Sequence, residues 1–313
     1  MIKVDHVSRS FGARQAVKDV SFTVEKGTVL GFLGPNGAGK TTTMRIIAGY
    51  LAPSEGQVLV CGEAVAANPA LTQRKIGYMP ENTPLYDDMT VEEFLVFIAE
   101  VRGYRGREGR DKAGTVIERC ALHSVRNQVI DTLSKGYRRR TSLAQALLHD
   151  PEVLLLDEPT EGLDPNQKQV VREMILEMAP EKAIVLSTHV LEEVTAVCTR
   201  AVIISGGTLV ANSTPRELLQ RSPGFNSVRL VVKADPDTAR AAFDDLPGVS
   251  RVLVLDHDAK RARLLLEPSE GQSIVAQALE RASSRKWSVS DVEVDSGHLD
   301  AVFRQITTTE DAA

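Results

Sequence analysis

One glycine-rich stretch near the N-terminus constrains the fold of this chain more than any other feature. It reads Gly34-Pro35-Asn36-Gly37-Ala38-Gly39-Lys40-Thr41 and fits the phosphate-loop pattern G-x-x-x-x-G-K-[ST]. Such a loop joins a strand to a helix, and the flanks agree, since β-rich Thr28–Phe32 precedes it and an apolar helical stripe, Met44–Ala48, follows it. The stretch therefore predicts an α/β core.

The loop also predicts a nucleotide site. Its glycines let backbone N–H groups turn inward, the helix that follows adds a positive dipole end, and Lys40 is placed to reach the β- and γ-phosphates. The Thr41 hydroxyl is placed to bind magnesium. A purely structural glycine turn is the alternative, and the Lys-Thr pair argues against it. The residues expected to contact the nucleotide are Gly34, Pro35, Asn36, Gly37, Ala38, Gly39, Lys40, Thr41 and Thr42.

Two acids, Asp157 and Glu158, end the apolar run Val153–Leu156. Because successive side chains leave a strand on opposite sides, the two acids are expected to have different roles. Asp157 suits the shell of a magnesium ion, and Glu158 suits a general base that polarises the attacking water. The alternative is a solvated strand end. This pair favours hydrolysis of the nucleotide over binding alone.

The rest of the first two thirds of the chain alternates between strand and helix patterns. The N-terminal residues predict a β-rich layer, with another hairpin around Gly56. Thr90 and Glu93 form a capping box that starts a helical insert. The strand-type runs Val153–Leu156 and Ala183–Leu186 bracket a helix of about fifteen residues, which predicts a mainly parallel sheet.

A second unit is expected from about residue 225. Its pattern is strand, helix, strand, strand, helix, strand, which is the ferredoxin-like order βαββαβ. A last helix places Leu299, Val302, Phe303 and Ile306 on one apolar face, which we expect to dock on a domain or a partner. The expected boundaries are 1–222 with a helical subdomain at about 85–145, then 225–306, then a disordered tail at 307–313.

The composition of the chain limits the classes of molecule that it is expected to bind. The net charge of −5 and the pI near 5.8 give no general attraction to nucleic acid, so nucleic acid is not an expected partner. Cys61, Cys120 and Cys198 show no CxxC spacing and are expected to be reduced thiols. No run approaches the roughly 18 apolar residues of a spanning helix, so a role at a membrane would need another chain.

Three further motifs carry a family resemblance. Leu133-Ser134-Lys135-Gly136-Tyr137 resembles the signature of the ATP-binding cassette (ABC) family, Glu161-Gly162-Leu163-Asp164 is similar to its D-loop, and Ser187-Thr188-His189 is similar to its switch histidine. They follow the phosphate loop in the family's order. The resemblance implies a P-loop ATPase core with an N-terminal β subdomain and a helical insert. Together with the C-terminal unit, the expected fold class is α/β plus a ferredoxin-like α+β domain.

The signature implies a site shared between two chains. In the family, the serine and glycine that match Ser134 and Gly136 contact the γ-phosphate held by the other subunit, and a helix N-terminus with a serine is an anion site. Two ATP molecules would then lie between two nucleotide-binding domains, so a second copy is expected. Lys135 and Tyr137 replace the usual glycine and glutamine. Lys135 adds positive charge near phosphate, and Tyr137 leaves open a changed hydrogen bond to the sugar or to the partner chain.

The resemblance gives roles to four more residues. His189 is expected to act with Glu158, although a lone histidine at a strand end is more often half-buried and inert. Asp164 is expected at the dimer interface and also has the features of a helix N-cap before a proline. Phe11 is expected to stack on adenine with Val17 on the same base, and a core role for the aromatic ring is equally open.

Glu81 departs from the family, where most members have a magnesium-contacting glutamine. A carboxylate about 4 Å from a phosphate oxygen would cost roughly 4 kcal/mol at an effective dielectric of 20. Glu81 is therefore expected to contact the metal and nucleotide only beside the cation, or to turn away.

The Pro-Glu variant at Glu81, the run Leu-Ser-Lys-Gly-Tyr-Arg and the C-terminal unit resemble one branch, the ATPase subunits of multidrug-type exporters, with gliding-motility-type ATPases as close look-alikes. The branch implies ATP and Mg²⁺ as cofactors, a homodimer and a separate transmembrane permease at the cytoplasmic face of the inner membrane.

Two alternatives remain beside this interpretation. One is a soluble ABC-type ATPase that acts on ribosomes or DNA, a class that usually carries two cassettes or a long coiled coil. The other is a regulatory module that holds ATP without hydrolysing it, against which Glu158 and His189 argue.

Overall fold

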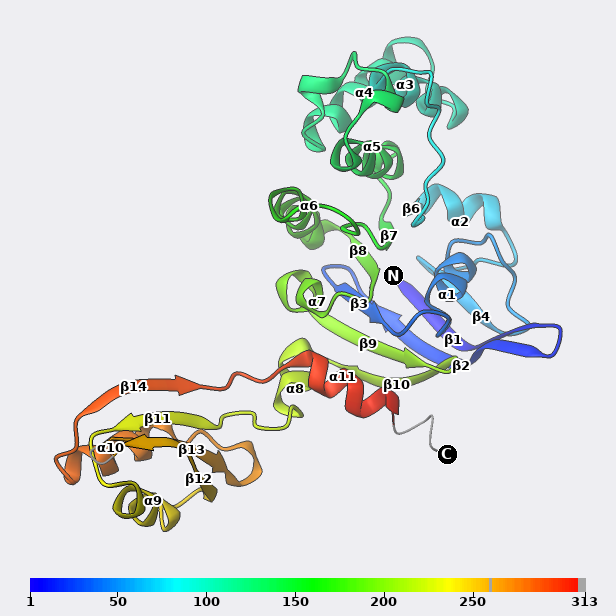
Figure 1. Cartoon of the computed structure of the whole chain (residues 1–313). Helices are drawn as coiled ribbons and strands as arrows, with labels where there is room; N and C mark the ends of the chain where they lie inside the picture. Colours follow the sequence, from blue (N-terminus) through cyan, green and yellow to red (C-terminus); the bar gives the residue numbers. More distant parts are fainter. Residues whose placement is uncertain (259–260, 309–313) are drawn as a thin grey trace. The chain divides into compact units, whose positions relative to one another are not determined.

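The computed structural model describes residues 1–258 and 261–308 (Figure 1). The chain divides into two compact units, Met1–Pro215 and Arg216–Ala313.

A six-stranded sheet forms the centre of the first unit. Its strands are β3 (Val29–Leu33), β6 (Ile76–Met79), β7 (Val153–Asp157), β8 (Ala183–Thr188), β9 (Arg200–Ser205) and β10 (Thr208–Ser213). They lie in the order β10-β9-β3-β8-β7-β6, and all neighbours are parallel except β10 and β9. Strands β3, β7 and β8 are buried along their whole length, as expected for strands covered on both faces. The predicted mainly parallel sheet is confirmed.

A four-stranded antiparallel sheet covers one side of this centre. It consists of β1 (Ile2–Phe11), β2 (Arg14–Val24), β4 (Glu55–Val60) and β5 (Glu63–Ala64), in the order β2-β1-β4-β5. Its buried side chains share one apolar core with Leu30 and Phe32 of β3. The N-terminal β-rich layer is therefore confirmed.

The hairpin expected around Gly56 was wrongly placed. The turn that joins β4 to β5 lies at Cys61 and Gly62, and Gly56 lies inside β4 with a φ of 78°. A Cβ at Gly56 would lie 2.1 Å from the carbonyl oxygen of His6. The glycine is needed because β1 passes close to it, and not because the chain turns there.

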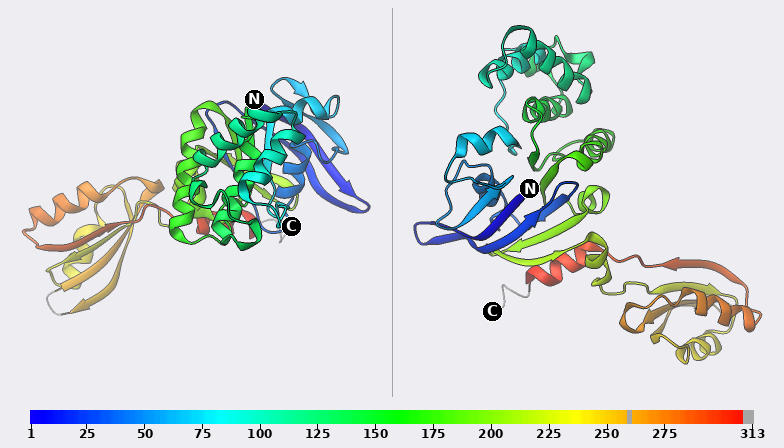
Figure 2. Two further views of the ribbon diagram at one scale, coloured as in Figure 1. Left: turned by 90° about the horizontal axis from the view of Figure 1, so that it is seen from above. Right: turned by 180° about the vertical axis from the view of Figure 1, so that it is seen from behind.

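Helices complete the first unit (Figures 1 and 2). They are α1 (Lys40–Ile47), α2 (Pro69–Lys75), α6 (Pro165–Met178) and α7 (Leu191–Val197), with a helical insert made of α3 (Val91–Val101), α4 (Gly106–Arg119) and α5 (Lys135–Leu147). Helix α3 begins with the predicted capping box, in which Glu93 N donates to Thr90 Oγ1 at 3.3 Å and Thr90 N donates to Glu93 Oε2 at 2.8 Å. Apolar residues of the insert share a core with Leu154 and Leu156 of β7.

The second unit has the predicted βαββαβ order. Its elements are β11 (Val228–Val232), α9 (Pro236–Asp244), β12 (Val249–Asp258), β13 (Arg261–Pro268), α10 (Val275–Ser284) and β14 (Val289–Val294), and the antiparallel sheet has the order β12-β13-β11-β14. The ferredoxin-like part of the predicted fold class is confirmed. Helix α8 (Pro215–Gln220) lies at the boundary between the units.

Helix α11 (Leu299–Thr308) is the last element. Leu299 and Val302 of its predicted apolar face are buried. The tail expected to be disordered, 307–313, overlaps the end of this helix, and residues 309–313 lie outside the described part of the chain.

Within the described residues, no helix combines the length and the apolar character that crossing a membrane requires. The three cysteines are free thiols in the structure.

Candidate active site

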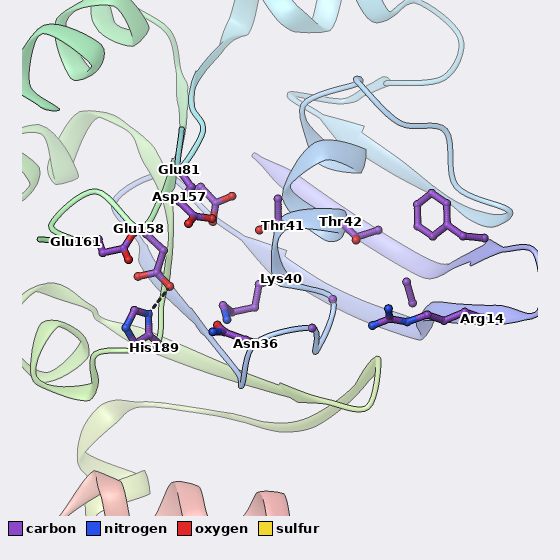
Figure 3. A pocket seen from close by; sticks show the side chains of 14 residues that line it. Arg14, Asn36, Lys40, Thr41, Thr42, Glu81, Asp157, Glu158, Glu161 and His189 are labelled. Atoms are coloured by element: carbon purple, nitrogen blue, oxygen red, sulfur yellow. Dashed lines mark hydrogen bonds and ion pairs between the residues drawn. The ribbon is translucent and has the colours of Figure 1, made fainter. Parts of the chain in front are cut away.

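A cavity of about 660 Å³ opens where the parallel strands of the central sheet end (Figure 3). Its walls come from the loops that follow β3, β6, β7 and β8, and from the tips of β1 and β2. Ligands of open parallel sheets bind at this carboxyl edge. The lining residues are Phe11, Arg14, Ala16, Asn36, Gly37, Gly39, Lys40, Thr41, Thr42, Glu81, Asp157, Glu158, Glu161 and His189.

The phosphate loop has the backbone that an anion cradle requires. Gly37 and Gly39 adopt φ values of 81° and 111°, which are unfavourable for residues with a side chain. At Gly39 a Cβ would lie 2.6 Å from the carbonyl oxygen of Ala16. Helix α1 begins directly after Gly39, so its first N–H groups are available to a ligand.

Lys40 is buried and is held by the loop itself. Its Nζ donates to the carbonyl oxygens of Gly34 at 2.7 Å and Pro35 at 3.3 Å. Burial lowers the pKa of Lys40, while the nearby carboxylates of Glu158 and Asp157 oppose that change. The ammonium therefore sits beside the cradle with carbonyl partners that a phosphate could replace.

Asp157 is 1% exposed and has one carboxylate oxygen without a partner. Its Oδ1 accepts a hydrogen bond from the Ser187 hydroxyl, whereas Oδ2 has no hydrogen bond to any described residue. A buried carboxylate oxygen without a partner is costly unless a cation binds it. The Thr41 side chain lines the same cavity.

These oxygen donors fit magnesium. Mg²⁺ usually takes one or two carboxylates and completes its shell with phosphates and water. The part of the chain that the structure describes has no group of three or more His, Cys, Asp or Glu side chains suited to a metal. A metal held here would depend on the nucleotide for further ligands.

The side chain of Glu158 points into the cavity, and its backbone has a left-handed conformation that is uncommon for residues other than glycine. It lies just beyond β7 with a φ of 50°, and its N–H donates to the carbonyl oxygen of Ser187 at 3.0 Å. We expected the alternation of side chains along a strand to point Asp157 and Glu158 in different directions. That reason was wrong, because β7 ends at Asp157 and Glu158 lies beyond it. The left-handed turn gives the two carboxylates different surroundings.

The Glu158 carboxylate pairs with His189, which follows β8. Oε1 of Glu158 lies 2.8 Å from Nδ1 of His189, drawn as a dashed line in Figure 3. Burial raises the pKa of Glu158, and the hydrogen bond from His189 lowers it. A carboxylate that is both buried and oriented by a histidine can accept a proton from water.

The cavity has an excess of acid. Four acidic side chains line it, Glu81, Asp157, Glu158 and Glu161, against the basic side chains of Arg14 and Lys40. Without a metal ion, a triphosphate would meet several carboxylates at close range, and that repulsion is unfavourable. The charge pattern therefore suits a phosphate ligand that arrives with a divalent cation.

Phe11 lines the cavity at the end of β1, and the Cζ atom of Arg9 lies 4.8 Å from the centroid of its ring. The structure does not place Val17 there. Val17 is fully buried in the apolar core, and Ala16 and Arg14 line the cavity from β2 instead. Adjacent strand residues face opposite sides, so a buried Val17 directs Ala16 toward the cavity.

The signature residues do not line the cavity of their own chain. Ser134 is the N-cap of α5 and accepts a hydrogen bond from Tyr137 N at 3.4 Å. Gly136 packs against Gln167 of α6, and the Lys135 side chain lies against Gly162. Asp164 caps α6 through a 2.9 Å hydrogen bond from Gln167 N.

Tyr137 faces the helical insert. Its hydroxyl lies 3.2 Å from the Ser124 hydroxyl, and the Arg140 guanidinium lies 4.3 Å from the centroid of its ring. The structure thus brings signature and D-loop residues together with each other. Glu161, the first residue of the D-loop motif, lines the nucleotide cavity of its own chain, and the signature residues do not.

Three lining residues, Arg14, Ala16 and Glu161, were missed as site residues. Arg14 lies three residues after Phe11, and Glu161 opens the D-loop motif. Their positions beside two predicted motifs were the available signal.

Comparison with known sequences finds related ATP-binding proteins. The pattern of the ABC transporter family matches residues 17–161. The uncharacterized ABC transporter ATP-binding protein YxlF of Bacillus subtilis (strain 168) is 38% identical over 98% of this chain and 99% of its own length. The linearmycin resistance ATP-binding protein LnrL of the same organism is 29% identical over 98% of both chains. The Nod factor export ATP-binding protein I of Paraburkholderia xenovorans (strain LB400) is 35% identical over 73% of this chain and 76% of its own length.

Solved structures share the fold of the first unit. An ATP-binding subunit of an ABC transporter superposes with a TM-score of 0.64 and 29% identity, over 71% of this chain and 92% of the other. The ATP-binding cassette MJ0796, solved as a dimer in a post-hydrolysis state with ADP and Pi, gives a TM-score of 0.63 and 25% identity, over 69% of this chain and 99% of the other.

Proposed function

The chain belongs to the ABC transporter family of ATP-binding proteins, and from this membership we propose that it is the ATP-hydrolysing subunit of an exporter that drives a separate permease. It is an ABC ATPase, and ATP is its nucleotide. The observation that carries the proposal is the Glu158–His189 pair, which faces the phosphate loop across one cavity.

The residues that line the cavity have different roles in the proposed hydrolysis of ATP. Lys40 exchanges its loop carbonyls for the β- and γ-phosphates, and the loop N–H groups bind the remaining phosphate oxygens. Thr41 and Asp157, with Glu81 beside them, would hold Mg²⁺, which when bound neutralises charge on the phosphates. Glu158 accepts a proton from the attacking water, and His189 orients Glu158 by donating from Nδ1. Positioning supplies most of the acceleration, because phosphoryl transfer needs little covalent chemistry from the protein.

A second copy of the chain completes the site. Ser134 is exposed at the start of α5 and does not line the cavity of its own chain, which suits contact with a nucleotide held by another chain. Gly136 lies two residues further along the helix and is buried against Gln167. Asp164 would lie at the same interface. MJ0796, the cassette with the similar fold, is a dimer. We therefore expect ATP to bring two copies together as a homodimer.

The permease is proposed to bind a groove between the nucleotide-binding core and the helical insert. A second cavity of about 760 Å³ lies there, and the exposed side chains of Tyr50 and Val101 are among its lining residues. Together with the surface around Glu81, this groove would place the chain at the cytoplasmic face of the inner membrane. The export assignment is supported by the similarity to the Nod factor export ATP-binding protein I.

The experiment that tests hydrolysis is Glu158→Gln. This substitution keeps the shape of the side chain and removes the proton acceptor, so turnover should be lost while ATP-dependent dimerisation is preserved. Phosphate release and size-exclusion chromatography with ATP measure the two properties. Glu152→Gln, the same change at the exposed opposite end of β7, is the matched control. Full ATPase activity in the Glu158 variant would contradict the assigned role.

Co-purification separates transport from the alternative of a soluble ABC-type ATPase. The exporter proposal expects a hydrophobic multi-span protein to purify with this chain from detergent-solubilised membranes. Its consistent absence would favour the alternative.

A further inference from the structure

A buried arginine, Arg139 of α5, lies behind the cavity and contacts two of its loops. Its Nη1 donates to the carbonyl oxygen of Glu81, and its Nη2 donates to the carbonyl oxygen of Glu158 at 2.9 Å. The Glu161 carboxylate lies 3.8 Å from Nη2. One guanidinium thus joins the helical insert to the backbone of the loops after β6 and β7.

Burial of this cation is unfavourable by itself. Arg139 is 9% exposed, and arginine is almost never fully buried unless it is paired. Its Nε has no hydrogen bond to any described residue, and Glu161, its nearest carboxylate, is 42% exposed. The guanidinium is therefore compensated mainly by two backbone carbonyls. Such a pairing fixes the position of those peptide groups, and a well-packed apolar side chain would serve stability at least as well.

Of the two peptide groups that Arg139 binds, that of Glu158 depends more on the arginine for its conformation than that of Glu81 does. Glu158 has a φ of 50°, a conformation that a residue with a side chain keeps only when its surroundings hold it there. Its N–H is fixed by Ser187, and its carbonyl oxygen accepts from Arg139 and, at 3.2 Å, from Glu161 N. Loss of Arg139 removes the shorter bond to the carbonyl. The backbone can then relax and carry the carboxylate away from His189.

We propose that Arg139 is a positioning residue for ATP hydrolysis, an inference that rests on the proposed function of Glu158. It acts by holding the Glu81 and Glu158 peptide groups in place and touches neither nucleotide nor water. A planar guanidinium suits this role because it donates from two nitrogens in a fixed plane, which a lysine ammonium cannot do.

The test is Arg139→Gln, with Arg138→Gln as the matched control. Arg138 lies on the same helix and donates to the Asp87 carboxylate at 2.7 Å and to the Ile130 carbonyl at 3.0 Å, both within the region of the insert. We expect R139Q to lower kcat by about tenfold or more and to change KM for ATP by less than about twofold. The reason is that, among the described residues, the hydrogen bonds of Arg139 go to Glu81 and Glu158 and not to the phosphate loop. R138Q should stay within about twofold of the wild type in both constants.

A folding defect must be separated from a positioning defect. Titration with Mg–ADP counts the folded sites, and kcat is expressed per site. Arg139→Lys keeps the charge and most of the volume, so we expect it to bind ADP like the wild type and to recover little of kcat.

Three results would overturn the inference: wild-type kcat in R139Q, wild-type kcat in R139K, or a loss that disappears when rates are expressed per ADP site. E158Q is assayed alongside. If E158Q is inactive and R139Q is normal, only the role of Arg139 fails. If both retain activity, the assigned role of Glu158 fails as well.

Discussion

The side chains that face the nucleotide cavity are held by partners from other elements. Ser187 of β8 binds Asp157 of β7, and His189 binds Glu158 across the same pair of strands. Lys40 is held by the carbonyl groups of its own loop. The protein itself therefore holds these side chains in place, which lowers the cost of organising the reacting groups.

The pH dependence of hydrolysis should report the pairing of Glu158 with His189. Burial raises the pKa of Glu158 and the histidine hydrogen bond lowers it, so His189→Ala should raise that pKa further. A general base must be deprotonated, so the acidic limb of the kcat profile should move to higher pH in the variant. Steady-state kcat measured across the acidic range checks this prediction.

The control is His123→Ala. Nδ1 of His123 lies 2.9 Å from Oε1 of Glu118, which is a similar contact. The His123 side chain is 71% exposed, however, and does not line the cavity. Its removal should leave the acidic limb in place. An unchanged limb in the His189 variant would show that another group controls the profile.

Site residues that belong to a local sequence motif could be predicted from the sequence. Hydrogen bonds from a side chain to backbone groups far away along the chain could not. Lys40, Asp157, Glu158 and His189 were predicted from their motifs, and the structure places all four around one cavity. Arg139 binds carbonyl groups 58 and 19 residues away along the chain. Every residue has a carbonyl, so no sequence pattern indicates which ones an arginine will contact.

Helix α3 offers a prediction at the level of an element. Thr90→Ala removes the N-cap acceptor and the partner of Glu93, and loss of such a cap costs about 1 kcal/mol. We expect amides of α3 that exchange by opening of the helix to exchange about fivefold faster, as measured by hydrogen exchange with mass spectrometry.

Thr115→Ala provides the comparison. Thr115 lies within α4, and its hydroxyl only donates back to the Asp111 carbonyl at 2.9 Å, so alanine should be neutral or slightly stabilising there. Equal protection of α3 in wild type and T90A would mean that tertiary packing alone fixes the start of the helix.

Elements with local start signals were predictable, and those set by a distant neighbour were not. The N-caps Thr90 and Asp164 mark the starts of α3 and α6 in both sequence and structure. Gly56 has the composition of a turn, but its positive φ serves the close approach of β1, which lies about fifty residues earlier in the sequence.

For the whole molecule, mixing two inactive variants tests whether the sites are shared. Lys40→Ala disables the phosphate loop, and Ser134→Arg disables the signature, so each homodimer should be inactive. A mixed dimer combines both defects in one site and leaves the other intact. With random pairing, half of the dimers are mixed and each has one intact site, so the mixture should regain at most about a quarter of wild-type ATPase activity. Coupling between the two sites would lower the recovered activity below that limit.

Each variant assayed alone at the same total concentration is the control for this mixture. A mixture as inactive as either variant would argue against independent composite sites. Activity in the Ser134 variant alone would argue that the signature contributes nothing to hydrolysis.

Helix α5 has a consequence for how two nucleotides would influence each other. Ser134 is its N-cap and Arg139 lies within its second turn. In the proposed dimer, the same helix would therefore contact the ATP of the neighbouring chain and hold Glu158 of its own chain. Binding at one site would then be linked to the geometry of the other, and linkage of this kind is reciprocal. The two ATP molecules would bind and react as a cooperative pair.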